Sequence, residues 1–363
     1  MRIDPRKDRT LLAALSRVAP GTALRAGLDD IIRAELGALI VIGEPSELSF
    51  LFSGGMRLGL PFTAQLLYEL AKMDGAIVIN REISRLVHAN VQLMPDPTIP
   101  SNETGTRHRT AERVAKQTGA LVISVSQQRE TVTLFVGDLR YQLADISELL
   151  ARTNQALATL ETYRQRLEQG LTRLTALEFQ SAVMLDDVLV VLQRGEMTTR
   201  MAEEIERNCV ELGEEGRLIR MQLDELMEDV PREKAAVVYD YMLAGDGDPS
   251  EGERLLERLA RLPYHKLLEF EELTALLGYP SDANPLDYAV SPRGYRVLSH
   301  IPRIPDGVVR HVVNDFGSLD AVIRASHRDL EAVDGVGGVR AREIREGLRR
   351  LQEHNLVDRY LQM

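Results

Sequence analysis

Strand and helix signals alternate along the first 145 residues of this 363-residue chain and then give way to helix alone. Short apolar runs bounded by turn residues are typical of buried strands, whereas apolar residues at every third or fourth position indicate helices. The predicted strands are 38–43, 47–52, 76–79, 91–94, 120–126 and 131–136. The predicted helices are 24–36, 63–72 and 110–118. This order predicts a mixed sheet flanked by helices, with the last two strands forming a hairpin.

From residue 146 to about residue 241 the sequence shows no strand signal, and leucines recur with heptad spacing. One heptad position holds Leu150, Leu157 and Leu171, and another holds Leu160, Leu167 and Leu174. Thr153 and Arg164 interrupt the pattern. We expect a helical spine that packs against neighbouring helices and carries no chemistry of its own. Prolines then mark a break at Pro263, Pro280, Pro285 and Pro292. The predicted domains are residues 1–145, 146–290 and 291–363.

Charge is distributed unevenly along the chain. Residues 1–150 contain 17 basic and 17 acidic residues, residues 151–290 contain 15 and 28, and residues 291–363 contain 12 and 10. Because the acidic middle would repel phosphates, any contact with DNA is expected in the C-terminal part. The 44% hydrophobic fraction allows buried cores. The lack of an apolar run of about 18 residues argues against a membrane span.

The cysteine content and the N-terminal residues predict the compartment. Cys209 is the only cysteine, so the chain cannot form an internal disulfide, and we expect a reducing cytoplasm. This thiol lies in an acidic helical segment and is interpreted as a buried or bystander group rather than as a nucleophile. The first nine residues are highly charged, and no signal-peptide core follows them.

Cations and hydroxyl groups surround a glycine just before the helix expected at 110–118. Residues 105–113 read Gly-Thr-Arg-His-Arg-Thr-Ala-Glu-Arg. Guanidinium groups suit bidentate capture of phosphate oxygens, and backbone N–H groups at a helix start add a second anion-binding element. Upstream, Asp74 and Gly75 precede the apolar strand at 76–79. Together these features predict a polyphosphate site, with an acid placed for a metal ion or a hydroxyl group.

Each of these features also has a purely structural interpretation. The arginine run is also found at solvated helix starts that carry incidental charges, which is the less favoured interpretation. Asp74 with Gly75 also makes an ordinary turn. His108 could be a structural histidine whose ring is satisfied on an apolar face. The local residues alone leave both interpretations open.

The C-terminal part contains a glycine-rich turn between two helical stretches. Gly335, Val336, Gly337 and Gly338 form the turn, and Arg340, Arg342 and Arg345 follow it. Glycines let the backbone approach DNA closely, free N–H groups hold a phosphate, and arginines add contacts that read no bases. Residues 301–309 look like a degenerate first copy that lacks the glycine pair. The alternative is a helical packing module whose glycines only close a tight turn.

These motifs resemble those of known families. Asp74-Gly75-Ala76 and Arg107-His108-Arg109 are similar to the two signature motifs of the diadenylate cyclase domain, and residues 89–96 and 103–113 extend the likeness. The glycine turn resembles the helix-hairpin-helix motif of DNA-binding proteins. From near one terminus to near the other, the chain resembles the DisA family of DNA integrity scanning proteins. The implied fold is an α/β cyclase domain, a helical spine and a C-terminal helix-hairpin-helix domain.

The resemblance implies condensation of two ATP molecules into cyclic di-AMP with release of two pyrophosphates. Two protomers would face one another with one ATP each, which fits an isologous arrangement. The family further implies a homo-octamer, regulation by branched or recombination DNA, a recombination ATPase as a partner, no membrane contact, and a cytoplasmic, nucleoid-associated location. Mg²⁺ or Mn²⁺ is implied as the cofactor, because a divalent ion generally neutralises triphosphate charge.

The resemblance also assigns roles at matching positions. Asp74 would activate the attacking 3′-hydroxyl, bind the metal, or both. Leu93 would contact the base, Ser126 the adenine edge, and Arg129 a phosphate or the partner protomer. Asp74, Arg107, His108 and Arg109 are the predicted catalytic residues. The predicted ATP-binding residues are Gly75, Ala76, Leu93, Thr106, Arg107, His108, Arg109, Thr110, Ser126 and Arg129.

One departure from the family pattern is visible. Gln128 stands where the family often has an arginine, which removes one candidate phosphate contact and leaves both signature motifs intact. Two rival functions stay open. One is an ATP-sensing DNA-binding scaffold without cyclase activity, and the other is a nucleotidyltransferase that acts on another substrate.

Overall fold

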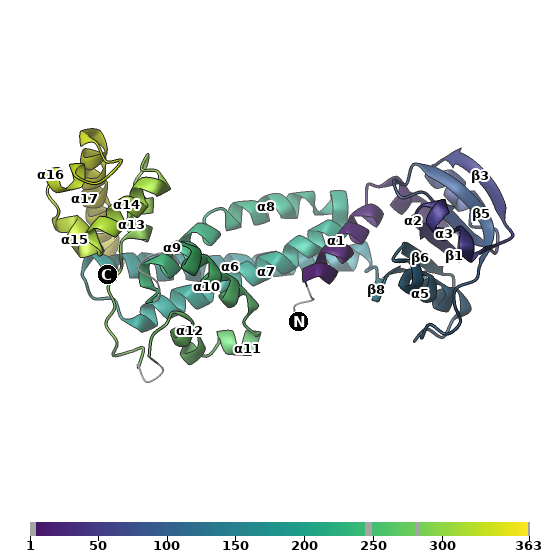
Figure 1. The fold of residues 1–363 in the computed structure, drawn as a ribbon, viewed down its shortest axis with the longest axis horizontal. Coiled ribbons are helices and arrows are strands. Elements are labelled where there is room, and N and C mark those ends of the chain that lie inside the picture. Colours follow the sequence, from purple (N-terminus) through teal and green to yellow (C-terminus); the bar gives the residue numbers. More distant parts are fainter. Residues whose placement is uncertain (1–4, 244–248, 281–283, 362–363) are drawn as a thin grey trace. The chain divides into compact units, whose positions relative to one another are not determined.

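The computed structural model describes residues 5–243, 249–280 and 284–361, which divide into two compact units (Figure 1). The first unit comprises residues 1–155 and 204–221, and the second comprises residues 156–203 and 222–363. Two long helices, α6 (Ile146–Phe179) and α7 (Leu185–Leu212), contribute residues to both units. The three-domain division inferred from the sequence stays a prediction.

The first unit is built on a mixed sheet of eight strands, as the sequence predicts. The strands are β1 (Ala38–Ile42), β2 (Phe52–Ser53), β3 (Met56–Pro61), β4 (Ala76–Ile79), β5 (Arg85–Leu93), β6 (Leu121–Ser126), β7 (Thr131–Val136) and β8 (Leu139–Gln142). Their spatial order is β2-β5-β4-β1-β6-β7-β8, and β3 also pairs with β5. Only β1 and β4 run parallel among these pairs of described strands. The expected β6–β7 hairpin is confirmed.

Helices cover both faces of this sheet (Figure 1). The helices of the first unit's N-terminal part are α1 (Pro5–Val18), α2 (Ala23–Arg33), α3 (Pro45–Leu48), η1 (Ser49–Leu51), α4 (Ala64–Leu70) and α5 (Thr106–Thr118). Alternation along the strands separates two apolar layers. Ile40 and Ile77 pack with α1, α2 and α4, whereas Val41 and Val78 pack with α3, η1 and α5. This three-layer arrangement fixes α5 against the sheet.

Two sequence predictions in this unit need correction. Residues 47–52 were expected to form a strand, but α3 and η1 occupy most of this range. Pro45 begins the helix, and Leu48 and Leu51 are buried three residues apart, which is helical spacing. The helix expected at 110–118 begins earlier, at Thr106, because Gly105 takes the extended N-cap conformation. The cations therefore lie in the first turn of α5 and not before it.

The second unit is helical. It contains most of α6 and α7 together with α9 (Val230–Tyr241), α10 (Pro249–Arg261), α11 (Tyr264–Leu267), α12 (Phe270–Leu276), α13 (Tyr295–Ser299), α14 (Asp306–Phe316), α15 (Leu319–Arg324), α16 (His327–Glu331) and α17 (Gly338–Leu361), while η2 (Gly213–Gly216) and α8 (Arg217–Met227) follow α7. The expected absence of strands from 146 to 241 is confirmed, since all of these residues are described. None of the described helices is long and apolar enough to cross a membrane.

The leucine heptads of α6 are buried as expected, with Leu150 only half-buried. Thr153 and Arg164, which interrupt the leucine pattern, occupy the same two heptad positions and so lie on the same stripe of the helix surface. Thr153 is fully buried and satisfies its hydroxyl by donating to the carbonyl of Leu149 at 2.6 Å. Arg164 lies half-buried and donates from Nε to the carbonyl of Leu226 at 3.1 Å. The stripe thus continues through both polar residues, because each finds a backbone acceptor.

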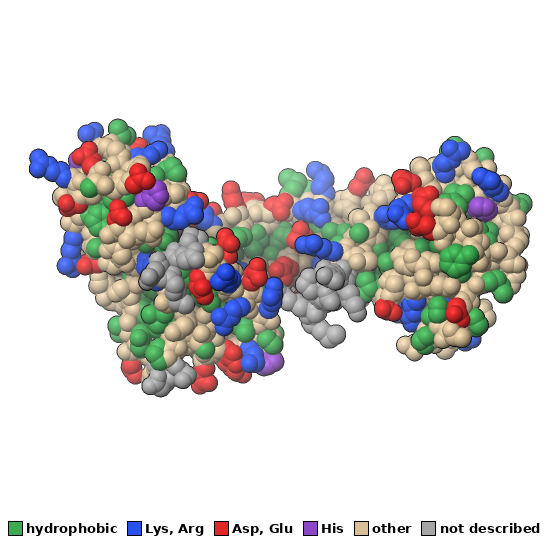
Figure 2. Space-filling model, viewed as in Figure 1, with side chains coloured by type: hydrophobic (Ala, Val, Ile, Leu, Met, Phe, Trp, Pro, Cys, Tyr) green, Lys and Arg blue, Asp and Glu red, His purple; other side chains and the backbone are tan. Residues whose placement is uncertain are grey.

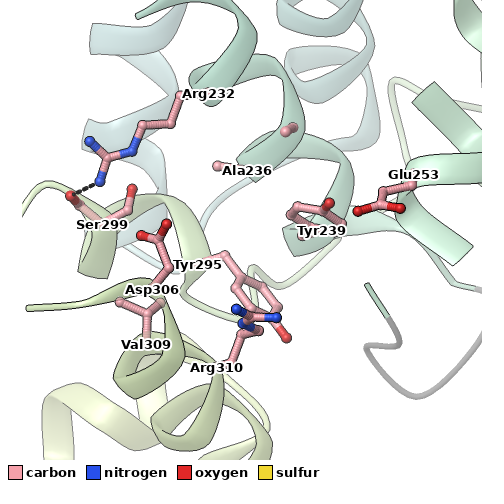
Figure 3. Close-up of a pocket in the computed structure, with 10 residues that line it drawn as sticks. Arg232, Ala236, Tyr239, Glu253, Tyr295, Ser299, Asp306, Val309 and Arg310 are labelled. Carbon is pink, nitrogen blue, oxygen red and sulfur yellow. Dashed lines mark hydrogen bonds between the residues drawn. The ribbon is translucent and has the colours of Figure 1, made fainter. Parts of the chain in front are cut away.

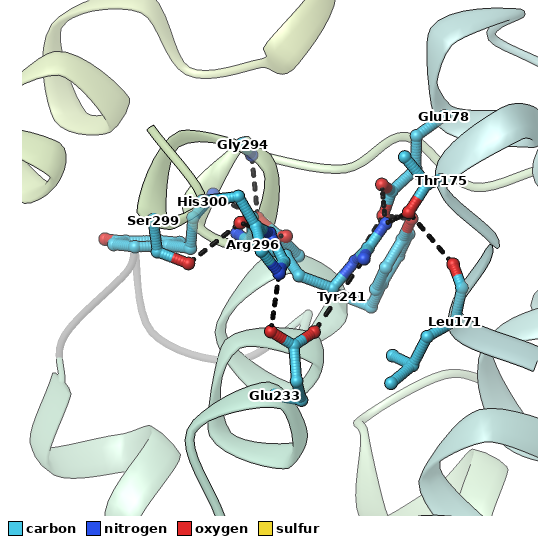
Figure 4. Close-up of polar contacts among 11 residues, drawn as sticks. Leu171, Thr175, Glu178, Glu233, Tyr241, Gly294, Arg296, Ser299 and His300 are labelled. Carbon is cyan, nitrogen blue, oxygen red and sulfur yellow. Dashed lines mark hydrogen bonds and ion pairs between the residues drawn. The ribbon is translucent and has the colours of Figure 1, made fainter. Parts of the chain in front are cut away.

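A buried ion pair joins distant parts of the second unit (Figure 4). Arg296 on α13 is 1% exposed, and its guanidinium contacts both carboxylate oxygens of Glu178 on α6. Arg296 also donates to the Thr175 hydroxyl at 2.7 Å, and the Tyr241 hydroxyl donates to Glu178 at 2.8 Å. The charges are therefore paired and hydrogen-bonded, as burial requires.

Asp240 on α9 lies beside this pair and caps the start of α13. Its carboxylate accepts three backbone N–H groups, from Gly294 at 2.7 Å, Tyr295 at 2.6 Å and Arg296 at 2.9 Å. Burial, and next the neighbouring Glu178 carboxylate, raise the pKa of Asp240 to about 7. The network thus holds α6, α9 and α13 together at the base of the C-terminal helices.

Candidate functional site

The strand register brings several predicted site segments to one end of the sheet. Parallel pairing of Ile40 with Ile77 places the starts of β1 and β4 together. Antiparallel pairing of Ala76 with Val91 brings the end of β5 to the same place. The pairing of Ala38 with Val125 does the same for the end of β6. Four segments therefore converge at this end of the sheet. Two of them lead into β1 and β4, and the other two follow β5 and β6.

A groove with a volume of about 690 Å³ lies at this end of the sheet. It is lined by Leu39, Ser53, Gly54, Gly55, Asp74, Gly75, Ala76, Asn90, Val91, Gln92, Leu93, Thr106, Arg107 and Thr110. The predicted residues Asp74, Gly75, Ala76, Leu93, Thr106, Arg107 and Thr110 are thus brought together. His108, Arg109, Ser126 and Arg129 are not part of this lining. The two sequence motifs contribute to one cavity, although 30 or so residues separate them.

Asp74 and Gly75 form the turn that leads into β4. The Asp74 side chain is exposed to the groove and forms no hydrogen bond or ion pair with the described residues. Gly75 packs directly on β5, because a Cβ atom there would lie 2.3 Å from the carbonyl carbon of Asn90. The carboxylate is therefore available to a ligand, and only glycine fits behind it.

The start of α5 forms another wall of the groove. Gly105 is its N-cap and supplies no side-chain cap, and the N–H of Arg109 donates to the carbonyl of Gly105 at 2.9 Å. The first-turn N–H groups before Arg109 have no acceptor within the helix. Thr106, Arg107 and Thr110 project from this turn into the groove. An uncapped helix start with an arginine is a favourable site for an anion.

The position of Arg107 depends on a distant glycine. The Arg107 guanidinium lies against Gly37, just before β1, where an added Cβ atom would be 2.2 Å from Nη1. Within the described residues the guanidinium has no hydrogen-bond or ion-pair partner. Gly37 therefore leaves the space that Arg107 occupies at the rim of the groove.

Replacing Gly37 with alanine is expected to displace the Arg107 guanidinium and leave the fold intact. The colliding atoms belong to the end of a flexible side chain, so the fold can adapt at small cost. If Arg107 binds phosphate, the affinity for ATP should fall by about tenfold, the worth of one charge-assisted contact. Calorimetric titration with ATP measures this change, and Gly307→Ala on α14 is the control, because nothing lies within 4 Å of a Cβ atom built there. Unchanged affinity in Gly37→Ala would contradict the role of Arg107.

His108 and Arg109 do not line the groove. The His108 ring packs edge-on against Phe135 with 6.3 Å between ring centroids. Burial lowers the pKa of His108, with Arg140 and Arg107 adding to the effect and Glu103 opposing it. Arg109 donates to the carbonyls of Glu103 at 3.3 Å and of Thr104 at 3.4 Å. In this structure, Arg109 holds the segment that leads into α5, and His108 packs α5 against β7.

Other side chains of α5 also bind the segment that leads into this helix. This segment, residues 95–105, has no regular secondary structure. Glu112 accepts from the Ser101 hydroxyl and from the N–H of Asn102. Arg113 donates to the carbonyl of Ile99 at 2.9 Å, and Lys116 donates to that of Pro100 at 2.9 Å. Several side chains of α5 therefore anchor the segment, which accounts for Glu112 and Arg113 without a ligand.

Ser126 ends β6, and Arg129 lies in the turn of the β6–β7 hairpin. The Ser126 hydroxyl accepts from the N–H of Arg129 at 3.4 Å, which stabilises the turn. Gln128 and Arg129 are both exposed. Their side chains are thus free of the sheet, at the end where the groove lies, and the roles inferred from the resemblance stay predictions.

The groove also contains residues that the sequence motifs did not identify. Asn90 and Gln92 come from β5, Ser53 ends β2, and Gly54 and Gly55 form the turn after it. Gly55 has a φ of +89°, and a Cβ atom there would lie 2.6 Å from the Val91 side chain. The contact of Gly55 with β5 depends on strand pairing, which local sequence does not reveal.

A divalent ion fits this groove only together with a ligand that brings further oxygens. Among the described residues, no group of three or more His, Cys, Asp or Glu side chains is placed to hold a metal ion. Asp74 is the single carboxylate in the lining. Mg²⁺ in nucleotide sites is commonly bound by one or two carboxylates and by substrate phosphates, so one acid is sufficient.

The predicted DNA-binding turn lies between α16 and α17. Gly335 has a φ of +77°, and Arg340 donates to its carbonyl at 2.7 Å. Arg342 and Arg345 are exposed on α17, whereas the side chain of Val336 is buried in the core of this part. In the face that Figure 2 shows, cationic and acidic side chains are mixed over the C-terminal helices. Val336 can therefore present only its backbone to a ligand.

The degenerate first copy has the same backbone turn. Arg303, between α13 and α14, has a φ of +69° at the position that corresponds to Gly335. The N–H of Ile304 donates to the carbonyl of Ile301 at 3.5 Å, as that of Val336 does to Val333 at 3.0 Å. The structure therefore contains two similar helix–turn–helix hairpins, and only the second has a glycine at the left-handed position.

A second cavity, of about 310 Å³, lies among α9, α10, α13 and α14 (Figure 3). Tyr239 and Tyr295 form an apolar wall, with 5.7 Å between ring centroids. Exposed charged side chains surround this wall, namely Arg232, Glu253, Asp306 and Arg310. None of the predicted site residues lines this cavity.

Comparison with known proteins gives consistent matches. The family model for the DisA bacterial checkpoint controller nucleotide-binding region matches residues 25–139, and the DisA linker region matches residues 143–286. The DNA integrity scanning protein DisA of Carboxydothermus hydrogenoformans is 49% identical over 96% of this chain and 98% of its own length. The proteins of the same name from Symbiobacterium thermophilum and Frankia alni are each 48% identical, over 96% and 98% of this chain and 97% and 99% of their own. The chain therefore belongs to the DisA family.

Proposed function

We propose that the chain is a diadenylate cyclase whose activity responds to DNA. It condenses two ATP molecules into cyclic di-AMP and two pyrophosphates, with one ATP held by each of two facing protomers. One observation carries the proposal: the unpartnered Asp74 carboxylate and the uncapped start of α5 line the same groove. This groove lies in the part of the chain that matches a nucleotide-binding family model.

The chemistry of the groove suits a nucleoside triphosphate. The N–H groups of the first turn of α5 and the Arg107 guanidinium offer donors to phosphate oxygens. The hydroxyls of Thr106 and Thr110 lie beside them. Apolar side chains at the other wall, including Leu39 and Leu93, provide a surface for the base. We therefore propose that the triphosphate lies at α5 and the base toward β5.

Ring closure consists of two identical displacements. In each, the 3′-hydroxyl oxygen of one nucleotide forms a bond to the α-phosphorus of the other and gives up its proton. The bond from the α-phosphorus to the bridging oxygen breaks, and its electron pair leaves with pyrophosphate. Asp74 assists removal of the proton, and Arg107 stabilises charge on the phosphorus and the leaving group. Because each groove holds one ATP and the two displacements are identical, we propose that two grooves face one another across a two-fold axis.

Mg²⁺ or Mn²⁺ is proposed as the cofactor. Asp74 would hold the ion together with the triphosphate oxygens, and the ion would neutralise part of the phosphate charge. The same carboxylate would then lie close to the attacking hydroxyl. The homo-octamer and the recombination ATPase partner implied by the family resemblance stay predictions.

The C-terminal hairpins are proposed to bind DNA as a helix-hairpin-helix pair. The turn at Gly335 leaves Gly337 open, since nothing lies within 4 Å of a Cβ atom built there. Arg342 and Arg345 are exposed next to it, and such groups contact phosphates without reading bases. Branched or recombination DNA is the proposed ligand, which fits the name DNA integrity scanning protein of the relatives and a nucleoid-associated location.

The test is a reaction of the purified protein with ATP and Mg²⁺ or Mn²⁺, with products separated by chromatography and identified by mass. We expect cyclic di-AMP with two pyrophosphates per molecule, and a lower rate when four-way-junction DNA is added. ATP that is bound but unchanged would instead support an ATP-sensing scaffold. A different nucleotide product would identify another nucleotidyltransferase, and a rate that saturating junction DNA leaves unchanged would contradict the regulation.

A further inference from the structure

Asn90 lines the groove in an unusual backbone conformation. Ala76 of β4 pairs with Val91 of β5, but Val78 pairs with His88, so two residues of β5 lie opposite Ile77. This is a bulge, and Asn90 is one of its two residues, with a φ of +53°. Bulges are frequent next to active sites, where they redirect a side chain. Here the bulge directs Asn90 toward the turn that carries Asp74.

The Asp74–Gly75 turn is held by this bulge from two sides. The N–H of Gly75 donates to Oδ1 of Asn90 at 3.2 Å. A Cβ atom at Gly75 would lie 2.3 Å from the carbonyl carbon and 2.5 Å from the Cα of Asn90. Backbone contact keeps the turn from moving toward β5, and the hydrogen bond keeps it from moving away. The position of the Asp74 carboxylate is thereby set.

Asparagine suits both requirements at this position. It tolerates the left-handed region better than other non-glycine residues do, and its side chain supplies an acceptor. Glycine would adopt the same φ but would lack the acceptor. Aspartate would keep an acceptor oxygen. The backbone and the hydrogen-bonding contributions can therefore be separated by substitution.

We propose that Asn90 is a positioning residue, which fixes the Asp74 carboxylate against the reacting groups through the Gly75 amide. The expected effect of Asn90 on turnover rests on the proposed cyclase function, whereas the contact between Asn90 and Gly75 does not depend on it. Errors of about 1 Å in the placement of reacting groups can lower a rate by about a hundredfold. Loss of the hydrogen bond should therefore reduce turnover much more than it reduces binding.

The test compares Asn90→Gly and Asn90→Asp with the unmodified protein in ATP binding and in turnover at saturating ATP. We expect Asn90→Gly to bind ATP within about threefold of the unmodified protein and to turn over at least about tenfold more slowly. At saturating ATP, Asn90→Asp should turn over faster than Asn90→Gly because it keeps the acceptor oxygen, whereas its added charge should weaken ATP binding. Equal turnover in Asn90→Gly, or a loss of affinity as large as the loss of turnover, would overturn the proposal.

A matched control and an independent readout complete the design. Ser181, in the second unit, is exposed and has a φ of +51°, so Ser181→Gly makes the same backbone change away from the groove. It should leave turnover unchanged. Hydrogen exchange over residues 73–76, without nucleotide, should be faster in Asn90→Gly and unchanged in Asn90→Asp. Unchanged exchange in Asn90→Gly would refute the positioning contact, whereas lack of product from the unmodified protein would refute the cyclase.

Discussion

Replacing Asp74 with asparagine is expected to lower formation of cyclic di-AMP by about a hundredfold to ten-thousandfold, the usual range for loss of a general base. Asparagine has nearly the same shape, but it neither accepts the hydroxyl proton nor attracts a divalent ion. The Asp74 side chain forms no hydrogen bond or ion pair with the described residues. The thermal unfolding midpoint of Asp74→Asn should therefore equal that of the unmodified protein. Product formation is measured by chromatography at saturating ATP.

Asp138 provides the matched control for this substitution. It follows Gly137 in the β7–β8 turn, is exposed, and lies at the end of β7 opposite to the groove. Asp138→Asn removes the same charge and should leave turnover unchanged. Normal cyclisation by Asp74→Asn would show that the acid neither activates the hydroxyl nor holds the ion. DNA binding by Asp74→Asn should also stay normal, which separates the two activities.

Local sequence was sufficient for the parts of the groove that depend on a few neighbouring residues. The Asp74–Gly75 turn is set by its glycine and by the short apolar strand after it, and a helix was expected close behind Gly105, although four residues later than its start at Thr106. Such features follow from residue type and spacing. The residues that line the groove from these two motifs were therefore predictable.

The remaining contributors depend on pairing between distant segments. Asn90 reaches Gly75 because β5 pairs with β4 around a bulge, and a single sequence does not reveal that register. Gly37 lies 70 residues before Arg107, and only the packing of α5 on the sheet brings the two together. The predicted strand at 47–52 failed for a related reason, because short apolar runs are compatible with either helix or strand.

The buried pair of Arg296 and Glu178 gives the largest expected effect on stability. Arg296→Met should lower the free energy of unfolding of the second unit by about 3–5 kcal/mol, because it leaves the Glu178 carboxylate buried without its partner. The side chains of this pair are 2% and 0% exposed, so solvent cannot compensate for the loss. Urea unfolding followed by far-UV circular dichroism measures the change.

A second substitution and a surface control identify the cause. Adding Glu178→Gln removes the uncompensated charge, and the double variant should recover a large part of the lost stability. Arg261 pairs with Glu257 on the surface of α10, with both side chains mostly exposed, so Arg261→Met should change stability little. If Arg296→Met and the double variant were equally unstable, lost packing of the long arginine side chain would be the cause and not the buried charge.

The groove and this network lie in different units. ATP turnover without DNA should therefore persist in both variants, under conditions in which their second unit stays folded. The response to junction DNA should be lost first, since the network holds α13 at the start of the first hairpin.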